Sequence, residues 1–421
     1  MEKKQKLHYA WKVMAACILI MTGTAGTLSA CMGNFVTPVV RELGCQVSQF
    51  TMVGSIQAIC MALLYTVAAK LLNTKYIGRI MCVALVAEMT AVALMSTYDS
   101  VYLFYLSAVI NGSAQAFTGL VAIPLVINMW FKKKTGTVLG IVIAIGNAAA
   151  MLYSLLSAQL ITIFGWRMAY LILAAMGSLI TIPAVFLLVK TPEEVGCAPY
   201  GAEEVPQVQQ KVAAPVEGEY GLTKKQAFRM PLLYIAWFAC ILYSYGSGVQ
   251  GYITTFTTME LAQTIRFGSV VGVCASLGGV LSSLIVGWIN DRFGVKAGML
   301  WGGVMYTIGY LAMFLGFTNP AFTLPAAFIV GLGGCMYRVQ CPLLARSVVG
   351  SKHYSEIWAI MMVANSLIGG GLYSSFGLFY DKLGTYRGAF LVAIGTFIAA
   401  GLFGAVAINQ SKKLRNQAAA N

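Results

Sequence analysis

The sequence predicts an all-α polytopic membrane protein with twelve transmembrane helices in two six-helix halves. The first observation is composition: the 421-residue chain is 59% hydrophobic and 10% charged, whereas soluble domains are about 25% charged. The second is that apolar runs long enough to cross a ~30 Å hydrocarbon layer as helices recur along the whole chain. The third is one long polar interruption near the middle, which separates two sets of six runs.

The individual spans follow from these runs and from the polar breaks between them. They are expected at residues 12–36, 48–72, 78–97, 101–127, 138–161, 167–189, 231–256, 266–289, 297–317, 322–345, 355–379 and 386–408. The central interruption is rich in proline and glutamate, which is typical of a loosely ordered linker. The predicted organisation is an N-terminal half of residues 1–190, a cytoplasmic linker of residues 191–230, a C-terminal half of residues 231–410 and a cytoplasmic tail of residues 411–421.

The distribution of basic residues predicts the orientation. Most lysines and arginines fall in the N-terminal segment, the central linker, the tail and the loops that share their side. The few in the opposite loops are Arg41, Arg167, Arg266, Lys382 and Arg387. The positive-inside rule then places both termini in the cytoplasm, in an inner (plasma) membrane. The net charge of +14 thus serves topology and contact with anionic lipid, and we expect no nucleic-acid partner.

Cofactor and metal chemistry have no signature in this chain. The ten cysteines include no C-x-x-C pair, and there are only two histidines. The phosphate-binding motif G-x-x-x-x-G-K-[ST] is also missing, so ATP is not expected to drive the protein. We therefore predict no cofactor, no metal and no enzymatic activity.

Weak internal repetition and one motif carry a family resemblance. The segments Ala69–Asn73 and Gly287–Asp291 follow corresponding spans of the two halves. A repeated six-helix unit is usual in transporters, although chance similarity between apolar sequences is the alternative. The segment Gly287–Lys296 fits G-x-x-x-D-R-x-G-x-K and resembles the signature of the major facilitator superfamily. The first-half copy, Ala69–Arg79, has Asn73 in place of the acid.

Three further segments are similar to one branch of that superfamily, the oxalate:formate antiporters and monocarboxylate porters. They are His8–Lys12, Asn128–Gly136 and Phe164–Tyr170. The resemblance implies that spans 1, 4, 7 and 10 line a central cavity and that the two halves alternate access. It also implies a gating role for Asp291 and Arg292, for which a solvated turn is the alternative. The arginine common in the span-four motif of proton-coupled relatives is missing from Val109–Gln115, and the Gly-Pro element of antiporters is missing from Gly140–Met151.

Arg338 is the one basic residue that the sequence places neither in a loop nor at a membrane surface. A buried arginine in a membrane almost always faces a protein interior or a water-filled cavity. Its planar guanidinium can hold a carboxylate through two hydrogen bonds, and small residues on the same helix side would leave room for a ligand. Tyr337 and Gln340 adjoin it and are candidate substrate-binding residues. The alternative is a structural arginine tied to backbone carbonyls or to one acid.

Polar stripes at helical spacing mark three other spans. Their members are candidate substrate-binding residues, or alternatively polar contacts between helices. They are Tyr243, Ser247, Gln250 and Thr254 in span seven, Asn111, Gln115 and Thr118 in span four, and Thr27, Cys31 and Asn34 in span one. Glu88 is the only acid deep in a span, and burial should keep it protonated. It is a candidate for proton coupling, with a neutral structural role as the alternative.

These observations together predict a secondary active transporter. Its expected substrate is a small organic anion, most plausibly a monocarboxylate, moved by alternating access with proton symport or anion exchange. We expect a monomer in the lipid bilayer, with protons or a counter-anion as the further partner. The alternative is an exporter of amphipathic or aromatic compounds in which Arg338 is structural. A membrane enzyme has less support because no cluster of catalytic residue types occurs within the spans. A receptor or scaffold without transport is a further alternative, which a flux measurement in liposomes would separate.

Overall fold

The computed structural model describes residues 8–27, 31–72, 74, 76–119, 122–132, 135–201, 224–350 and 354–420. The described chain is helical almost throughout, which confirms the all-α polytopic fold. It forms two compact units. Unit 1 comprises residues 1–43 and 56–213, and unit 2 comprises residues 44–55 and 214–421.

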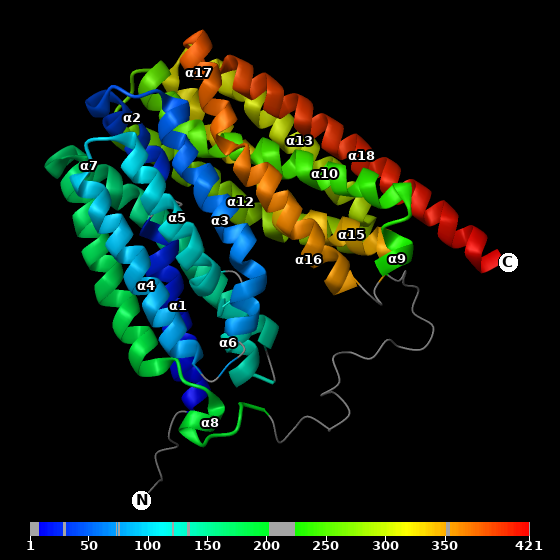
Figure 1. Cartoon of the computed structure of the whole chain (residues 1–421). Coiled ribbons are helices and arrows are strands. Elements are labelled where there is room, and N and C mark those ends of the chain that lie inside the picture. Colours follow the sequence, from blue (N-terminus) through cyan, green and yellow to red (C-terminus); the bar gives the residue numbers. More distant parts are fainter. Residues whose placement is uncertain are drawn as a thin grey trace, which may run out of the picture. The chain divides into compact units, whose positions relative to one another are not determined.

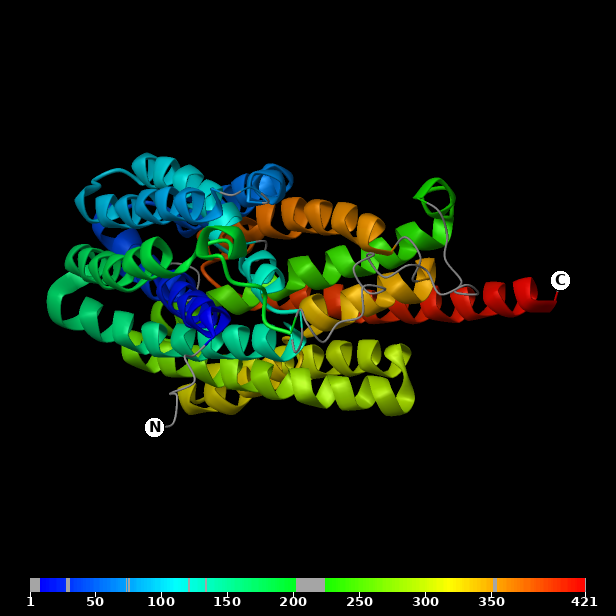
Figure 2. The ribbon, with the colours of Figure 1, turned by 90° about the horizontal axis from the view of Figure 1, so that it is seen from below.

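Unit 1 is a bundle of long apolar helices. They are α1 (Tyr9–Thr27), α2 (Met32–Leu43), the later part of α3 (Val47–Leu71), α4 (Ile77–Leu94), α5 (Val101–Thr118), α6 (Ala122–Trp130) and α7 (Thr135–Leu188). Helix α1 packs along α7, and α4 packs against α5 and α7 (Figure 1). Helix α7 contains two spans, because the chain reverses at Gly165, whose φ of 78° favours glycine. Figure 2 shows its two arms running antiparallel.

Aromatic side chains close one end of unit 1. The ring centroids of Tyr9 and Trp130 are 5.0 Å apart, and those of Trp11 and Phe131 are 5.5 Å apart. The indole of Trp130 donates a hydrogen bond to the Lys190 carbonyl at 2.7 Å. Two of the three segments that carry the branch resemblance, His8–Lys12 and Asn128–Gly136, therefore pack against each other.

The first part of the predicted linker is ordered. Helix α8 (Pro192–Val195) begins with a capping box formed by Thr191 and Glu194. The backbone of Tyr200 then pairs with Trp130 and Lys132 through hydrogen bonds of 2.8 and 2.9 Å. Composition alone predicts loose order here, but these backbone bonds hold the segment on unit 1. Residues 202–223 lie outside the described residues.

Unit 2 contains long unbroken helices and spans that are divided into shorter helical segments. They are α9 (Lys224–Ala227), α10 (Pro231–Ser247), α11 (Ile253–Thr255), α12 (Ile265–Phe293), α13 (Val295–Met313), α14 (Thr323–Leu332), α15 (Cys341–Val349), α16 (Tyr354–Asn365), α17 (Gly377–Leu383) and α18 (Arg387–Ala420). Helix α18 packs against both α10 and α13 (Figure 1), and α12 packs closely on α14. The start of α3 also belongs to unit 2.

The seventh, tenth and eleventh spans each contain a π-helical turn. These turns are Phe256–Glu260, Met336–Gln340 and Ser366–Gly370. Pro342 contributes to the second one, because it has no N–H to donate to the Arg338 carbonyl. Helices α12, α13 and α18 run without such breaks. Irregular backbone within a membrane is tolerated where it is covered by protein or lines a water-filled cavity.

Eight helical segments of the described chain are long and apolar enough to span a membrane, and one of them, Thr137–Leu188, is the reversed pair of spans in α7. The segments Tyr9–Thr24 and Pro320–Leu332 are shorter apolar helices. Besides the breaks in the seventh, tenth and eleventh spans, further boundaries differ from the prediction. The first span divides into α1 and α2, the fourth divides into α5 and α6, and the last helix continues to Ala420.

Candidate functional site

The structure brings Glu88 together with two residues of the span-four stripe in unit 1. Glu88 lies on α4 and is fully buried. Its Oε1 accepts a hydrogen bond of 3.2 Å from the Gln115 amide, and its Oε2 lies 3.4 Å from the Thr118 hydroxyl. Among the described residues no lysine, arginine or histidine forms an ion pair with it. A candidate proton carrier therefore contacts two candidate substrate-binding residues.

The third member of the stripe, Asn111, lies one turn before Gln115 on α5. It is fully buried, and neither its side-chain oxygen nor its nitrogen has a hydrogen-bond partner in the described part of the chain. Leaving a buried amide unpaired costs about 1–3 kcal/mol. The adjacent Gly112 allows the Gln57 backbone of α3 to approach, since a Cβ there would lie 2.9 Å from the Gln57 Cα. This part of α5 is therefore both tightly packed and polar.

Span one contributes an interhelical contact in unit 1. The Asn34 amide on α2 donates to the Ser154 carbonyl and to the Ser157 hydroxyl of α7, both at 2.8 Å. Cys31 of the same stripe is fully buried, and the side chain of Thr27 lies outside the described part. The side-chain nitrogen of Asn34 is therefore engaged by α7.

Arg338 lies in the π-helical turn Met336–Gln340 of unit 2. Its side chain lies outside the described part of the structure, so only the backbone position is known. The neighbouring Tyr337 is half-buried. A π-helical turn is rare and frequently occurs at functional sites. Pro342 is the only residue of this segment that signals the turn in the sequence.

Gln340 makes a contact that the sequence did not reveal. It is fully buried, and its Nε2 donates to Oδ1 of Asn290 on α12 at 2.7 Å. The remaining side-chain atoms, Gln340 Oε1 and Asn290 Nδ2, have no partner among the described residues. Asn290 immediately precedes Asp291 of the signature. A pair of amides therefore joins the tenth span to the signature end of the eighth.

The span-seven stripe makes contacts with other helices and within its own helix in unit 2. The Tyr243 hydroxyl is buried and donates to the Met299 carbonyl of α13 at 2.7 Å. The Ser247 hydroxyl donates to Ser244 at 2.7 Å, and Thr254 donates to Gly268 of α12 at 3.3 Å. Gln250 is half-buried in the 3₁₀ turn Gly248–Tyr252. Helix contact accounts for Tyr243 and Thr254 in this state.

The signature residues Asp291 and Arg292 are exposed at the end of α12. The Arg292 guanidinium lies over the rings of Trp288 and Phe293, at 5.6 and 5.5 Å from their centroids. No ion pair between Asp291 and a described residue occurs in unit 2. The gating role of the two residues stays a prediction.

Three charged residues at helix ends make contacts that their sequence positions did not predict. In unit 1, Arg167 donates to Glu42 at 3.0 Å and to Asp99 at 2.7 Å. In unit 2, the Asp381 carboxylate accepts hydrogen bonds of 2.9 and 2.8 Å from the first two amides of α3. Glu260 similarly accepts the Tyr386 amide at 2.8 Å beside the start of α18. Their sequence signal was only an isolated charge in a short loop.

Comparison with known proteins agrees with this fold. The sequence model of the Major Facilitator Superfamily matches residues 18–275 and 260–420, and the chain belongs to this family. A probable inositol transporter of Arabidopsis thaliana is 24% identical over 174 residues, which cover 40% of this chain and 29% of that protein. The chain therefore matches less than a third of that relative's length.

Two crystal structures share the fold over nearly the whole chain. One is a bacterial homolog of the human lysosomal transporter Spinster, with a TM-score of 0.69 and 15% identity, covering 98% of this chain and 99% of that one. The other is the nucleoside transporter NupG, with a TM-score of 0.70 and 13% identity, covering 95% and 99%. The chain is thus a multi-pass membrane protein of the major facilitator type.

Proposed function

We propose that the protein moves a small monocarboxylate together with a proton across the inner (plasma) membrane. The observation that carries this proposal is the hydrogen bonding of Glu88 to Gln115 and Thr118. A protonatable group is thereby joined to side chains that the family resemblance assigns to the substrate cavity. Symport of one anion with one proton is electroneutral, so the membrane potential would not oppose uptake of the anion.

The surroundings of Glu88 suit a change of protonation. A buried carboxylate without a cation is costly, so the neutral acid is favoured when Glu88 is closed off from water. The Thr118 hydroxyl lies 3.3 Å from the Ala114 carbonyl as well as 3.4 Å from Glu88. It can donate to the carbonyl while accepting from a protonated Glu88, or donate to the carboxylate after the proton leaves. Both protonation states therefore keep a hydrogen-bond partner.

The substrate class rests on Arg338 and on the branch resemblance. One guanidinium in a span matches one carboxylate, and the π-helical turn around Arg338 interrupts the regular helix at that residue. Tyr337, Gln340, Ser247, Gln250 and Asn34 remain candidates for further substrate contacts. Exchange of one anion for another is the second mode of transport that this site would support.

Reconstituted transport tests the proposal. Wild type in liposomes should accumulate one monocarboxylate when the outside is made acidic, and that compound should raise the melting temperature of the purified protein. Glu88→Gln should lose pH-driven accumulation but keep exchange of labelled for unlabelled substrate. Glu193→Gln, at an exposed acid of α8, is the matched control. Arg338→Gln should lose the carboxylate-induced stabilisation.

Two results would contradict the proposal. If accumulation by Glu88→Gln still follows the pH gradient, Glu88 is not the proton-coupling residue. If inositol, a nucleoside or an uncharged aromatic compound stabilises the protein and no carboxylate does, the substrate is not a carboxylate. Inositol and nucleosides are included because the similar transporters are named for them. An uncharged aromatic ligand would instead favour the exporter interpretation, with Arg338 in a structural role.

A further inference from the structure

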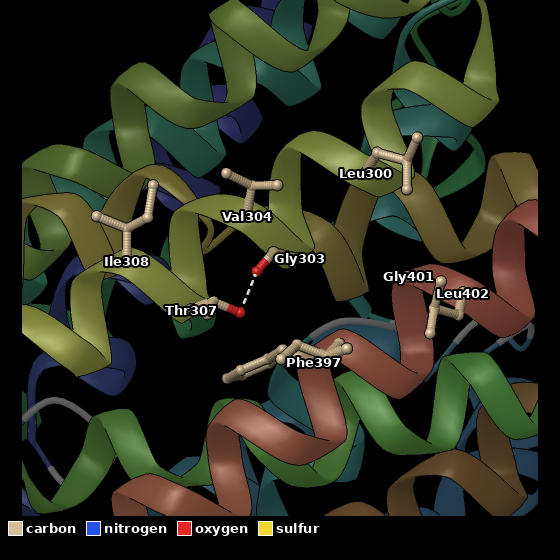
Figure 3. Close-up of a pocket in the computed structure, with 9 residues that line it drawn as sticks. Leu300, Gly303, Val304, Thr307, Ile308, Phe397, Gly401 and Leu402 are labelled. Carbon is tan, nitrogen blue, oxygen red and sulfur yellow. Dashed lines mark hydrogen bonds between the residues drawn. The ribbon is translucent and has the colours of Figure 1, made fainter.

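An apolar groove of about 240 Å³ lies between α13 and α18 of unit 2 (Figure 3). Leu300, Val304 and Ile308 line it from α13, and Ile398 and Leu402 line it from α18. These side chains are all exposed at the surface of the unit, with Leu402 59% exposed. Both helices are long and apolar enough to span a membrane, so the groove opens to the surrounding hydrocarbon.

The depth of the groove comes from two glycines. Gly303 and Gly401 line it, and a Cβ on either residue would lie 3.5 or 3.7 Å from the Tyr243 hydroxyl beneath them. That hydroxyl is engaged by the Met299 carbonyl, and the Thr307 hydroxyl is engaged by the Gly303 carbonyl at 2.7 Å (Figure 3). The groove therefore offers shape and apolar surface but no unpaired hydroxyl, which suits a hydrocarbon chain.

A basic residue, Lys296, lies on the groove-lining face of α13, beyond one end of the groove. Lys296, Leu300, Val304 and Ile308 follow one another at intervals of four residues, so they lie along one face of α13. Lys296 is therefore about 6 Å along the helix axis from Leu300. It is half-buried and forms no ion pair with any described residue. The loop that precedes it is the one predicted to face the cytoplasm.

We propose that this groove binds one acyl chain of an anionic phospholipid whose phosphate pairs with Lys296. The chain would lie against Gly303 and Gly401, above Tyr243 of α10, and would fill the space between α13 and α18. The pairing of a cation with an apolar groove on the same helix face distinguishes this site from the general lipid-exposed surface. The site does not depend on the transported substrate.

Lipid titration of the full-length protein in detergent, read by native mass spectrometry, tests the proposal. Dioleoyl phosphatidylglycerol should bind about fivefold more tightly than dioleoyl phosphatidylcholine, because one lysine contributes that preference. Lys296→Gln should abolish the preference, whereas Lys225→Gln, at an exposed lysine of α9, should retain it.

Substitution of Gly401, which lines the groove, tests whether the groove holds an acyl chain. Gly401→Leu should weaken binding of both lipids roughly tenfold. A loss of this size needs only about two methylene groups of the acyl chain to be displaced from the groove. Gly395→Leu is the matched control on the same helix, because a Cβ there meets no atom within 4 Å. Gly401→Ala serves if the larger variant does not fold, since its Cβ meets nothing closer than 3.7 Å, and it should give a smaller loss.

Three results would overturn the proposal. The first is that the Gly401 variants bind each lipid as tightly as Gly395→Leu does. The second is a phosphatidylglycerol preference that survives Lys296→Gln. The third is full competition by glycerol 3-phosphate, which would leave a headgroup patch without an acyl site.

Discussion

The contact between α12 and α14 in unit 2 should tolerate no added methyl group. A Cβ on Gly278 would overlap the Phe328 carbonyl oxygen and would lie 2.9 Å from the Gly331 Cα. A Cβ on Gly331 would meet the Ala275 carbonyl and lie 2.8 Å from the Gly278 Cα. All of these atoms are backbone, so no side chain can rotate away and the two helices must separate. Overpacking of this kind costs about 1–3 kcal/mol.

Gly278→Ala is therefore compared with Gly287→Ala on the same helix. A Cβ on Gly287 meets nothing within 4 Å, and both changes gain the same ~1 kcal/mol of helix propensity. The difference between the two variants then isolates the clash. We expect the free energy of unfolding of Gly278→Ala to be lower by about 1–3 kcal/mol, measured by SDS titration in detergent micelles with tryptophan fluorescence. Equal stability of the two variants, within about 0.5 kcal/mol, would refute the close approach of the two helices.

Two further predictions concern polar contacts in unit 2. Asp381→Asn removes the charge that two amides of α3 share, so hydrogen exchange of residues 44–55 should become faster while that of α13 stays unchanged. Unchanged exchange at residues 44–55 would contradict the cap. Asn290→Leu and Gln340→Met should each destabilise by about 1–3 kcal/mol, because each removes the hydrogen bond of the partner amide, and the double variant should recover most of the loss. Additive losses, measured by the same SDS titration, would show that the two amides are independent.

The sequence predicted which polar residues share one face of a helix, but it did not predict which other helix packs against that face. Spacing alone placed Asn111, Gln115 and Thr118 on one side of α5. It could not show that Glu88 of α4 lies against that side, because this depends on how closely two helices approach. The pair Asn290–Gln340 was invisible for the same reason, since fifty residues separate its members.

Helix continuity was equally hard to predict from the sequence. Apolar runs gave the number and approximate place of the spans, because burial in lipid constrains composition strongly. The π-helical turns in the seventh, tenth and eleventh spans depend on local backbone hydrogen bonds, and only Pro342 signalled one of them. The end of α7's first arm was predicted well, because Gly165 lies in a Phe-Gly-Trp-Arg segment between two long apolar runs.

The two units offer different chemistry for a transport cycle. Unit 1 places a protonatable side chain, Glu88, among polar groups on otherwise regular helices. Unit 2 keeps α12, α13 and α18 continuous, and its π-helical turns lie in the seventh, tenth and eleventh spans, of which the tenth contains Arg338. Breaking a helix in a membrane costs backbone hydrogen bonds, so such breaks persist only where protein or water satisfies the freed groups. If unit 1 holds the proton and unit 2 holds the anion, Glu88→Gln should bind substrate without coupling it, whereas Arg338→Gln should lose binding itself. A loss of carboxylate binding in both variants would show that the two roles are not divided in this way.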